Sequence, residues 1–435
     1  MSDKKAINSA MVVGGGVAGM QAALDIANQG YKVYLVEKSP TIGGRMAQLD
    51  KTFPTLDCSA CILTPRLSEV SRHPNIELLA YADLEEVTGT VGDFLVTVIK
   101  RSRYVDEEKC AACGDCTEVC PVEVPNEFDR GLGIRKAIYT PFPQATPNIY
   151  TIDMENCIRC KRCVSECQRD AIDLEMQDER LEFRVGAIVI ATGYEMFDVS
   201  RYPRLGYARI PDVIDALEYE RLINAAGPTQ GHLIRLSDGK IPKSIGFIQC
   251  VGARDVAKGV PYCSRVCCMY GIKNAVMAKE HYPDAEVNIY YADIRAFGKG
   301  FEEFYEMART RFGVNFFRGR VAEVTRTQEG RLAVKVEDTL SAKPMEIEHD
   351  LVVLSPGIVP PQDLLRLSEK LGVSVRNDGY IDVSHHYFGP VDTRIPGVFV
   401  CGCADGPKDI PDSVTAGSAA AMKATIILSH GGQSS

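Results

Sequence analysis

Sixteen cysteines lie along this chain of 435 residues, and twelve of them fall into three groups whose spacing is typical of metal ligands. Two groups share the spacing Cys-x2-Cys-x2-Cys-x3-Cys, a run in which thiolates bind [4Fe–4S] clusters. They are Cys110, Cys113, Cys116 and Cys120, followed by Pro121, and Cys157, Cys160, Cys163 and Cys167, followed by Gln168. The N-terminus is charged and carries no export signal, so this many cysteines indicate metal or redox chemistry rather than structural disulfides.

The two runs together predict two clusters whose ligands are crossed. In bacterial ferredoxins with two cubanes, each run gives three thiolates to one cluster and its fourth thiolate to the other. Zinc is the main rival metal, and paired runs of four cysteines argue against it. One cluster is therefore expected at Cys110, Cys113, Cys116 and Cys167, and the other at Cys157, Cys160, Cys163 and Cys120.

A third group of cysteines follows a short apolar strand expected at residues 244–249. In dinucleotide-binding proteins a glycine-rich motif follows such a strand, but here only one glycine of that motif, Gly252, is present. We expect a third [4Fe–4S] cluster in the vacated place, since a helix N-terminus favours thiolates. The alternative is a set of buried or redox-paired cysteines. The group consists of Cys250, Cys263, Cys267 and Cys268.

The elements around these cysteines begin with a complete dinucleotide-binding unit. Residues 11–16 form an apolar strand that leads into Gly-x-Gly-x-x-Gly, an amphipathic helix follows, and a second strand ends at Glu37. The glycines allow a pyrophosphate to approach the backbone at the helix N-terminus, and the acid binds a ribose hydroxyl. The residues expected at the cofactor are Gly14, Gly16, Val17, Ala18, Gly19 and Glu37.

Later segments favour FAD over NAD. Residues 37–45 resemble the extended loop of flavoproteins with two dinucleotide-binding domains, residues 186–194 resemble their return strand, and residues 396–406 resemble their final strand. Cys403 stands where those proteins usually carry an aspartate beside the ribityl chain, and Asp405 follows two residues later. The segments add Lys38, Gly43, Gly44, Arg45, Thr192, Gly193, Gly402, Cys403 and Asp405 to the expected FAD site.

A second strand–helix–strand unit is expected with its helix at residues 267–281 and its second strand at residues 286–291. Its loop lacks Gly-x-Gly-x-x-Gly, so we expect no NAD(P)H there, although Arg295 is a basic residue of the kind that NADP-binding relatives often keep at this point. The expected domains are an FAD domain at 1–105, a ferredoxin domain at 106–180, the FAD domain continued at 181–240, a cluster-bearing Rossmann-like domain at 241–340 and the rest of the FAD domain at 341–435.

Four residues are candidates for redox catalysis. Cys58 and Cys61 form a Cys-x-x-Cys pair close after the FAD loop. They are either a dithiol that exchanges electrons with the flavin or a pair with a structural or cluster-side role. Lys273 and Lys408 are candidates for a positive charge near flavin N1 or N5. The simpler alternative is that each is a solvated lysine on the surface. Cys401, like Cys403, is most simply a small buried side chain.

Three longer segments, residues 51–70, 251–275 and 398–421, resemble the flavin-bearing A-type chain of heterodisulfide reductase, and the likeness covers essentially the whole sequence. The resemblance implies an α/β fold: a thioredoxin-reductase-like core with two dinucleotide-binding domains and an inserted bacterial-type 2[4Fe–4S] ferredoxin domain. It also implies a further cubane at the cysteines of residues 250–268. Compared with the long form in methanogens, no domain is expected before the first strand and no second ferredoxin domain after it. The short form also resembles flavin subunits of a quinone-interacting oxidoreductase.

The expected function is electron transfer through FAD and three [4Fe–4S] clusters in a heterodisulfide-reductase-like complex, with electron bifurcation left open. The implied partners are B- and C-type subunits and an electron-donating hydrogenase, formate dehydrogenase or similar module, and a homodimer is also left open. Two alternatives are a stand-alone NAD(P)H-dependent disulfide or sulfur reductase that uses Cys58 and Cys61, and a scaffold whose clusters are structural. The net charge of −9 gives no reason to expect nucleic-acid binding. The chain is expected in the cytoplasm, reaching a membrane only through partners, because it lacks a long apolar run.

Overall fold

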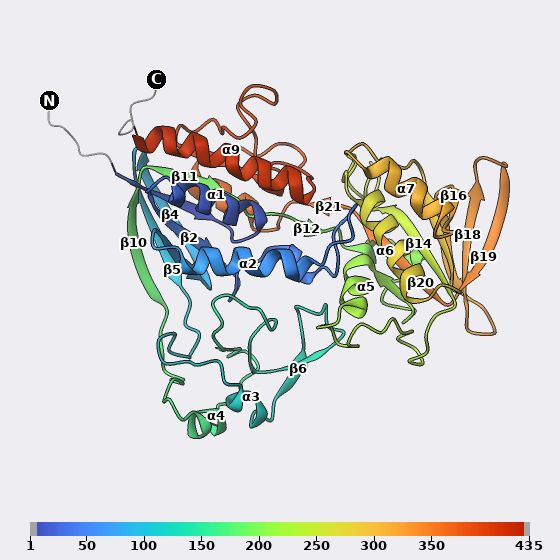
Figure 1. Cartoon of the computed structure of the whole chain (residues 1–435), viewed down its shortest axis with the longest axis horizontal. Helices are drawn as coiled ribbons and strands as arrows, with labels where there is room; N and C mark the ends of the chain where they lie inside the picture. Colours follow the sequence, from blue (N-terminus) through green and yellow to red (C-terminus); the bar gives the residue numbers. More distant parts are fainter. Residues whose placement is uncertain (1–6, 430–435) are drawn as a thin grey trace. The chain divides into compact units, whose positions relative to one another are not determined.

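Buried parallel strands organise both halves of the chain, whose computed structural model describes residues 7–429 (Figure 1). The structure separates into two compact units. Unit 1 contains the described residues up to Ala47, Cys61–Tyr194 and the residues from Pro360 onward, and unit 2 contains Gln48–Ala60 and Glu195–Val359. Among the helices of residues 7–429, none combines the length and the apolar composition that a membrane span requires.

The unit boundaries differ from the domain boundaries expected from sequence. The sequence predicts residues 48–60, 195–240 and 341–359 in the FAD domain, but they lie in unit 2. The reason is strand pairing: β13 (Val213–Asp215) pairs in parallel with β20 (Leu351–Pro356), which also pairs with β14 (Ser244–Val251). These short apolar segments do not reveal their partners, because pairing depends on residues more than one hundred positions away.

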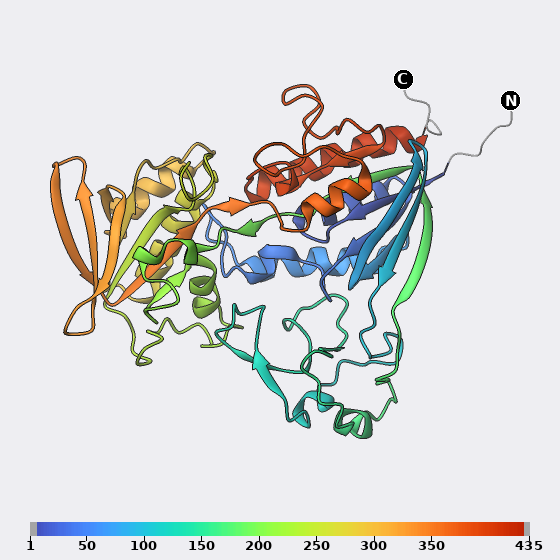
Figure 2. The ribbon, with the colours of Figure 1, turned by 180° about the vertical axis from the view of Figure 1, so that it is seen from behind.

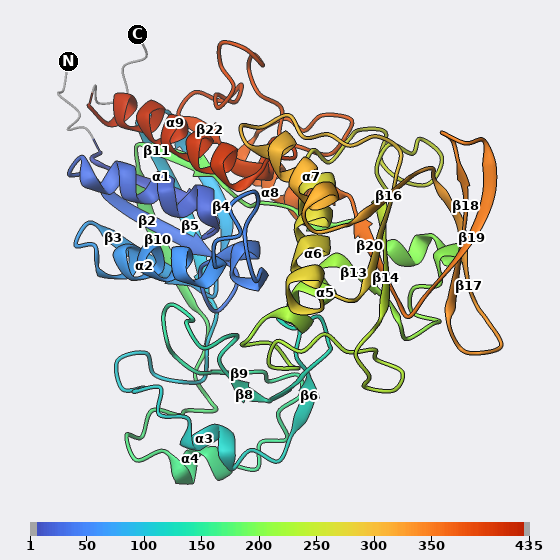
Figure 3. The ribbon, with the colours of Figure 1, turned by 45° about the vertical axis from the view of Figure 1, so that its right-hand side comes forward.

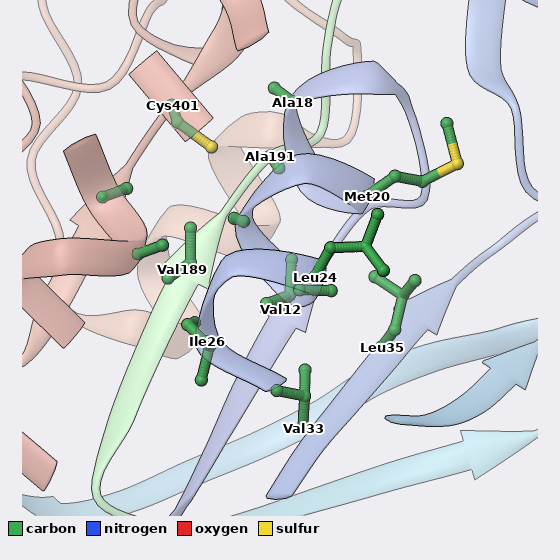
Figure 4. Packing of buried hydrophobic residues seen from close by; sticks show 14 of the residues in the cluster. Val12, Ala18, Met20, Leu24, Ile26, Val33, Leu35, Val189, Ala191 and Cys401 are labelled. Carbon is green, nitrogen blue, oxygen red and sulfur yellow. The ribbon is translucent and has the colours of Figure 1, made fainter. Parts of the chain in front are cut away.

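Unit 1 is built on a five-stranded parallel sheet in the order β22–β11–β1–β2–β3. Alternate residues of its strands face two different cores, as the twofold period of a strand requires. One face packs against helices α1, α2 and α9, and Figure 4 shows this packing around Val12, Leu24 and Val189. The bounds are β1 Ser9–Val13, β2 Lys32–Glu37, β3 Ile76–Ala80, β11 Ala187–Ile190, β22 Val398–Val400, α1 Val17–Asn28, α2 Ser59–Arg72 and α9 Ile410–Ser429.

The other face of this sheet is covered by a three-stranded antiparallel sheet and by helix α8 (Leu364–Leu371). The antiparallel sheet has the order β10–β5–β4, formed by Glu179–Val185, Asp93–Lys100 and Ala82–Thr90. Lys100 pairs with Glu179, so the two ends of the long insertion between β5 and β10 lie side by side, as Figure 2 shows. An inserted module therefore leaves and re-enters the unit at one point.

The insertion has a small core of its own in which two cysteine-bearing helices meet. Helices α3 and α4 are each a single turn, and each begins directly after a left-handed residue, Gly114 in one case and Lys161 in the other. Their bounds are α3 Asp115–Glu118 and α4 Arg162–Glu166, and the short strands are β6 Glu123–Pro125, β7 Ile134–Lys136, β8 Ile138–Tyr139 and β9 Thr151–Ile152.

Unit 2 repeats the parallel strand–helix–strand plan. Its main sheet has the order β13–β20–β14–β15–β16, and a separate antiparallel sheet has the order β17–β18–β19 (Figure 3). Helix α6 packs against β14, β15 and α5. The remaining bounds are β15 Glu286–Tyr291, β16 Asn315–Arg318, β17 Val321–Arg326, β18 Leu332–Asp338, β19 Lys343–His349, α5 Ala216–Ile223, α6 Cys267–His281 and α7 Phe301–Thr310, with short strands β12 Glu195–Met196 and β21 Ile358–Val359.

A buried histidine links three elements of unit 2. His349 is fully buried, its Nδ1 lies 2.8 Å from Ser244 Oγ, and its Nε2 lies 2.7 Å from Tyr290 Oη. Its ring occupies the space above Gly246, where a Cβ would lie 2.8 Å from His349 Cδ2. Burial, with Arg331 adding to it, lowers the pKa of His349 to about 4. The ring is therefore neutral in the folded unit at neutral pH.

This histidine predicts a loss of stability in mild acid. The unfolded chain binds a proton at His349 with a pKa of 6.5, whereas the folded chain binds it near pH 4, so unfolding is favoured as the pH falls through this window. Between pH 7.5 and pH 5.5 the loss is expected to be about 1 kcal/mol. Thermal unfolding at the two pH values, compared between wild type and His349→Gln, isolates this contribution. The exposed His386 provides the matched control, and an equal pH dependence of all three proteins would contradict the prediction.

Candidate functional site

The glycine loop after β1 brings α1 close to the ends of two strands. A Cβ on Gly14 would lie 2.3 Å from the carbonyl oxygen of Ala191, and a Cβ on Gly19 would lie 1.9 Å from the carbonyl oxygen of Gly14. Gly14 also has a φ of +113°, which side chains rarely adopt. These two glycines are therefore required by packing alone.

Gly16 is different, because no described atom lies within 4 Å of the position its Cβ would take. It precedes α1 as the N-cap residue, caps no backbone N–H with a side chain, and the first turn of α1 contains no acid. The first N–H groups of α1 are thus available to an anion, and the helix dipole favours one there. An open cradle at an uncapped helix terminus fits the pyrophosphate of FAD.

Glu37 lies beside this cradle at the end of β2. Its carboxylate accepts hydrogen bonds from the backbone N–H groups of Gly15, at 2.7 Å, and Ser39, at 2.8 Å. The Thr192 hydroxyl is buried and has no partner among the described residues. Glu37 and Thr192 line one hollow, together with Gly14, Lys38, Arg366 and Lys370. A buried orphan hydroxyl next to an acid at the strand ends fits a ribose and its adenine.

Two further loops expected at FAD also pack against the glycine loop. Gly43 donates its N–H to the carbonyl oxygen of Gly15 at 2.9 Å, and a Cβ on Gly44 would lie 3.0 Å from Gly16 Cα. Gly402 has a φ of +63°, and a Cβ there would lie 2.7 Å from Ala18 Cβ. Gly43, Gly44 and Gly402, which the sequence assigns to the FAD site, thus lie in direct contact with the glycine loop.

The cysteines of this last segment are buried. Figure 4 shows Cys401 at the edge of the apolar cluster near Ala18 and Ala191. Cys403 donates its thiol to the carbonyl oxygen of Lys408 at 3.4 Å, and burial raises the pKa of both thiols. Lys408 forms an ion pair with Asp405. Burial raises the pKa of Asp405, although the charge of Lys408 acts in the opposite direction. Lys408 is therefore a partly buried, paired cation rather than a solvated surface lysine.

The two ferredoxin runs fold alike. At the second and fourth positions after the first cysteine of each run the backbone is left-handed, at Ala112 and Gly114 in one run and at Arg159 and Lys161 in the other. Such turns point successive N–H groups inward and form the concave nests found at iron–sulfur sites. Arg159 N–H donates to Cys157 Sγ at 3.4 Å, a contact of the kind that tunes a cluster.

One predicted ligand set lines a single hollow of the insertion. Cys120 comes from the first run and three cysteines come from the second, and apolar side chains such as Ile152 and Leu174 complete the walls. This is the crossed set that the spacing predicts. The four cysteines are Cys120, Cys157, Cys160 and Cys163.

For the other crossed set, Cys116 lies within electrostatic reach of Cys110 and Cys113, and Cys167 accepts the N–H of Ala171 at 3.4 Å. Burial raises the pKa of Cys116 to about 12, so cluster binding here must displace a proton. Within residues 7–429 no three His, Cys, Asp or Glu side chains are grouped closely enough to bind one metal ion. A cubane places its four thiolates on four different irons, so its ligands do not need that grouping.

The third cysteine group surrounds the start of α6 in unit 2. Cys250, Cys267 and Cys268 are buried and Cys263 is half-buried. A hydrogen bond from the Cys267 thiol lowers the pKa of Cys250 to about 6, with Arg254 and Arg320 contributing. Hydrogen bonds to Cys250 and Cys268, together with complete burial, raise the pKa of Cys267, and the hydrogen bond with Cys267 lowers the pKa of Cys268.

The loop that carries these cysteines leaves no glycine cradle. Gly252 has a φ of +76°, and a Cβ there would lie 2.1 Å from the ring of Phe197. Cys250 and Arg265 also adopt left-handed backbone conformations, at φ +61° and +62°. The glycine is used for internal packing, so the backbone offers no open approach of the kind present at Gly16.

Arginines that the sequence does not single out surround this group. Arg254 Nη2 donates to Asp293 at 2.7 Å, while its Nη1 is buried with no partner among the described residues. Arg320 lies in a distant turn but donates to the carbonyl oxygen of Arg254 at 2.9 Å. A buried donor without an acceptor beside Cys250 and Cys263 fits a sulfur of a bound cluster. The sequence signal was the pair of arginines inside the cysteine loop, but Arg320 and Asp293 are brought in only by the fold.

The other redox candidates are placed as follows. Lys273 is buried in unit 2 and forms an ion pair with Glu220, so the reading of a surface lysine is wrong for it. Glu220 also accepts the backbone N–H of Asp50 at 3.0 Å, and burial raises the pKa of the Asp50 carboxyl. Cys58 immediately precedes α2, Cys61 lies in its first turn, and both are exposed.

Three family models match parts of the chain. They are pyridine nucleotide-disulphide oxidoreductase at residues 271–421, 4Fe-4S dicluster domain at residues 109–172, and FAD dependent oxidoreductase at residues 10–58. The last two matches contain the glycine loop and the two ferredoxin runs. They confirm an FAD-binding domain and a dicluster domain in this chain.

Solved structures with this fold include the thioredoxin reductase of T. acidophilum, with a TM-score of 0.53 and 14% identity over 96% of this chain and 98% of that one. The thioredoxin reductase of Lactococcus lactis gives a TM-score of 0.52, also at 14% identity, over 97% and 99% of the two chains. At this identity the likeness concerns the fold. It confirms the expected thioredoxin-reductase-like core.

Relatives of known name are much more similar in sequence. The A-type chain of the H(2):CoB-CoM heterodisulfide,ferredoxin reductase of Methanothermobacter marburgensis is 52% identical over 98% of this chain. An iron-sulfur chain of the same type, from the CoB--CoM heterodisulfide reductase of Methanopyrus kandleri, is 54% identical over 98%. The chain spans 64% of the length of each of these curated relatives. Over that shared length, which includes the FAD domain, the dicluster domain and the third cysteine group, the chain is HdrA-like, that is, similar to the A-type chains of heterodisulfide reductases.

Proposed function

We propose that this chain is the flavin- and cluster-bearing electron-transfer component of a heterodisulfide-reductase-like complex. The observation that carries the proposal is the presence in one chain of an open glycine cradle at Gly16 and of one crossed cysteine set around a single hollow of the inserted dicluster domain. When bound, FAD exchanges two electrons at a time and the clusters exchange one, so the pair connects two-electron and one-electron chemistry.

In this proposal each part of the site has a separate task. The uncapped start of α1 binds the pyrophosphate, Glu37 and Thr192 hold the ribose, and the segment 402–405 lies near the ribityl chain. Lys408, paired with Asp405, is the cation of unit 1 that we assign to the flavin ring. The four thiolates of residues 250–268 hold a third cubane, and the orphan Nη1 of Arg254 donates to it.

The names of the relatives support a finer assignment of partners. The relative from Methanothermobacter marburgensis is named for hydrogen, a heterodisulfide and ferredoxin, and one from Methanococcus maripaludis adds formate. We propose that this chain likewise works beside B- and C-type subunits and a hydrogenase or formate dehydrogenase module. In that role its flavin divides the electrons of one donor between two acceptors.

A stand-alone NAD(P)H-dependent disulfide reductase that uses Cys58 and Cys61 is the second candidate function. The specific observation in its favour is that both cysteines are exposed, as a thiol that exchanges with a disulfide must be. Against it stands the loop of residues 250–263, in which glycine serves packing and no open cradle receives a pyrophosphate. The two functions differ in whether a nicotinamide reduces the flavin directly.

The glycine cradle is tested by Gly16→Val. The backbone at Gly16 is extended and its surroundings are open, so the variant is expected to fold with little loss of stability while the side chain occupies the pyrophosphate position. Loss of at least nine-tenths of the bound FAD is expected, measured from the visible spectrum of purified protein. Gly30→Ala, at the other end of α1 with φ +90°, is the control: it should cost about 1 kcal/mol of stability and keep the flavin. Full flavin retention in Gly16→Val would contradict the assignment.

The third cluster is tested by counting iron. Anaerobically purified protein is expected to hold about twelve irons, from three cubanes of four irons each. The double variant Cys267→Ser/Cys268→Ser should hold about eight, because two of the four proposed ligands are lost. Cys401→Ala removes a buried cysteine outside the three groups and should leave the count unchanged. Eight irons in the wild type as well as in the double variant would remove the third cluster from the proposal.

The absence of direct NAD(P)H oxidation is tested by anaerobic mixing with NADPH. Residues 250–268 offer thiolates and a negatively charged cluster where a pyrophosphate would need open N–H groups, so we expect no flavin bleaching within seconds at about 450 nm. Dithionite should bleach the same sample and thus shows that the flavin is reducible. Rapid bleaching by NADPH alone would instead establish the stand-alone reductase.

A further inference from the structure

Cys263 differs from the other three cysteines of its group in reaching the surface of unit 2. Cys250, Cys267 and Cys268 are buried, whereas Cys263 is half-buried and lines an open hollow. The hollow is lined by Cys263, Arg265, Ile294, Arg295, Ala296, Phe297 and Glu302. A group held by these four thiols would therefore have one edge, at Cys263, near the surface of this unit.

The surface around this hollow is basic. The three segments 250–268, 291–302 and 318–320 contain seven lysine or arginine residues and three acidic residues, although the whole chain has a net charge of −9. Two of the acids are engaged by neighbours. Asp293 is shared by Arg254, at 2.7 Å, and Arg318, at 3.7 Å, and Asp255 accepts the hydroxyl of Tyr202 at 2.5 Å. The surface therefore carries a local positive charge in an acidic protein.

Apolar side chains accompany these charges. Phe297 is 59% exposed, and the guanidinium of Arg265 lies over its ring at 5.2 Å from the centroid. Val256, in the same loop as Cys250 and Cys263, is 89% exposed. Arginine and aromatic residues are enriched at the centres of protein interfaces and among the residues that dominate their binding energy. This composition is typical of a surface that binds another protein rather than of one that faces only solvent.

We propose that the face of unit 2 around Cys263, centred on Arg265, Arg295 and Phe297, is a docking surface for an acidic electron-transfer protein. The proposal rests on the proposed third cluster. Charge complementarity selects an acidic partner, and the exposed Phe297 gives it an apolar contact. Each productive encounter oxidises the reduced partner by one electron and reduces this chain by one electron. This face suits electron transfer because Cys263 brings the cysteine group close to the surface there.

The positive charge on this surface should also raise the rate at which the acidic partner associates with it. Opposite charges steer two proteins into contact and raise the association rate by ten- to a thousandfold at low ionic strength, an effect that salt screens within about 8 Å at physiological ionic strength. Reversing two arginines in the hollow should thus act mainly on the bimolecular rate at low salt. It should leave the cofactors in place, because Arg265 and Arg295 are not proposed as ligands.

The test uses anaerobic holoprotein and a dithionite-reduced, acidic two-cubane ferredoxin as the probe. Stopped-flow absorbance gives the second-order rate of electron transfer at 20 mM and 300 mM salt. For Arg265→Glu/Arg295→Glu we expect a rate at least tenfold below wild type at low salt and a difference of less than threefold at high salt. The control Arg326→Glu/Lys343→Glu makes the same change of charge in the separate β17–β19 sheet and should stay within twofold of wild type. Equal rates in both double variants would overturn the docking surface.

Two further measurements distinguish the docking surface from the proposed third cluster and from a site for a small anion. Iron content and the EPR spectrum of each variant report the third cluster independently of the electron-transfer rates. A wild-type protein with eight irons would contradict the proposed cluster. Twelve irons, with rates that Arg265→Glu/Arg295→Glu leaves unchanged, would contradict only the docking surface. Calorimetry with inorganic pyrophosphate, at matched ionic strength, tests a small anion as the occupant. Saturable pyrophosphate binding that Arg265→Glu/Arg295→Glu abolishes would assign the hollow to a small anion and overturn the proposal of a protein partner.

Discussion

The architecture of unit 1 depends on how closely helix α1 approaches the ends of β1 and β11. Side chains are excluded there, because a Cβ at Gly14 or Gly19 would overlap backbone oxygen atoms at 2.3 Å and 1.9 Å. The same crowding continues toward α9, where a Cβ on Gly417 would lie 2.5 Å from the carbonyl oxygen of Ala18. This packing fixes the start of α1 at the carboxyl ends of the parallel strands. The open position at Gly16, where we propose the anion site, therefore lies next to glycines that the packing itself requires.

Unit 2 uses the same strand–turn–helix geometry with a different occupant. Helix α6 also begins without a side-chain cap and without an acid in its first turn, so its N-terminus favours negative charge just as α1 does. In unit 1 the group that we propose there is a pyrophosphate, which needs exposed backbone. In unit 2 the turn is long, its glycine is packed against Phe197, and thiols stand at the helix start. The electrostatic requirement of the helix end is the same in both units, and the chemical group that meets it differs.

Sequence reasoning located what is encoded locally. Strands β14 and β15 and helix α6 begin at the residues that the sequence predicts, and the helix also ends there, because runs of apolar residues define such elements within a short window. Spacing also predicts the crossed cysteine sets, and the members of one set line a single hollow. The missed features are long-range: β13 joins β20, Arg320 reaches Arg254, and Lys273 meets Glu220 across two helices. None of these pairings is determined by neighbouring residues, so a single sequence leaves them open.

The three kinds of site also differ in how they compensate negative charge, and this bears on which of them a partner senses. At Gly16 the compensation comes from the helix dipole, and in the dicluster domain it includes backbone N–H groups such as those of Arg159 and Ala171. Such dipoles act over the first turn or the nearest atom and have little field beyond it. Around Cys263 the compensation comes from full charges on arginine side chains, several of them at the surface. Full charges at an open surface extend their field by about a Debye length into the solvent. In an acidic chain, the arginines around the third cysteine group can thus attract an approaching molecule before it makes contact with the protein.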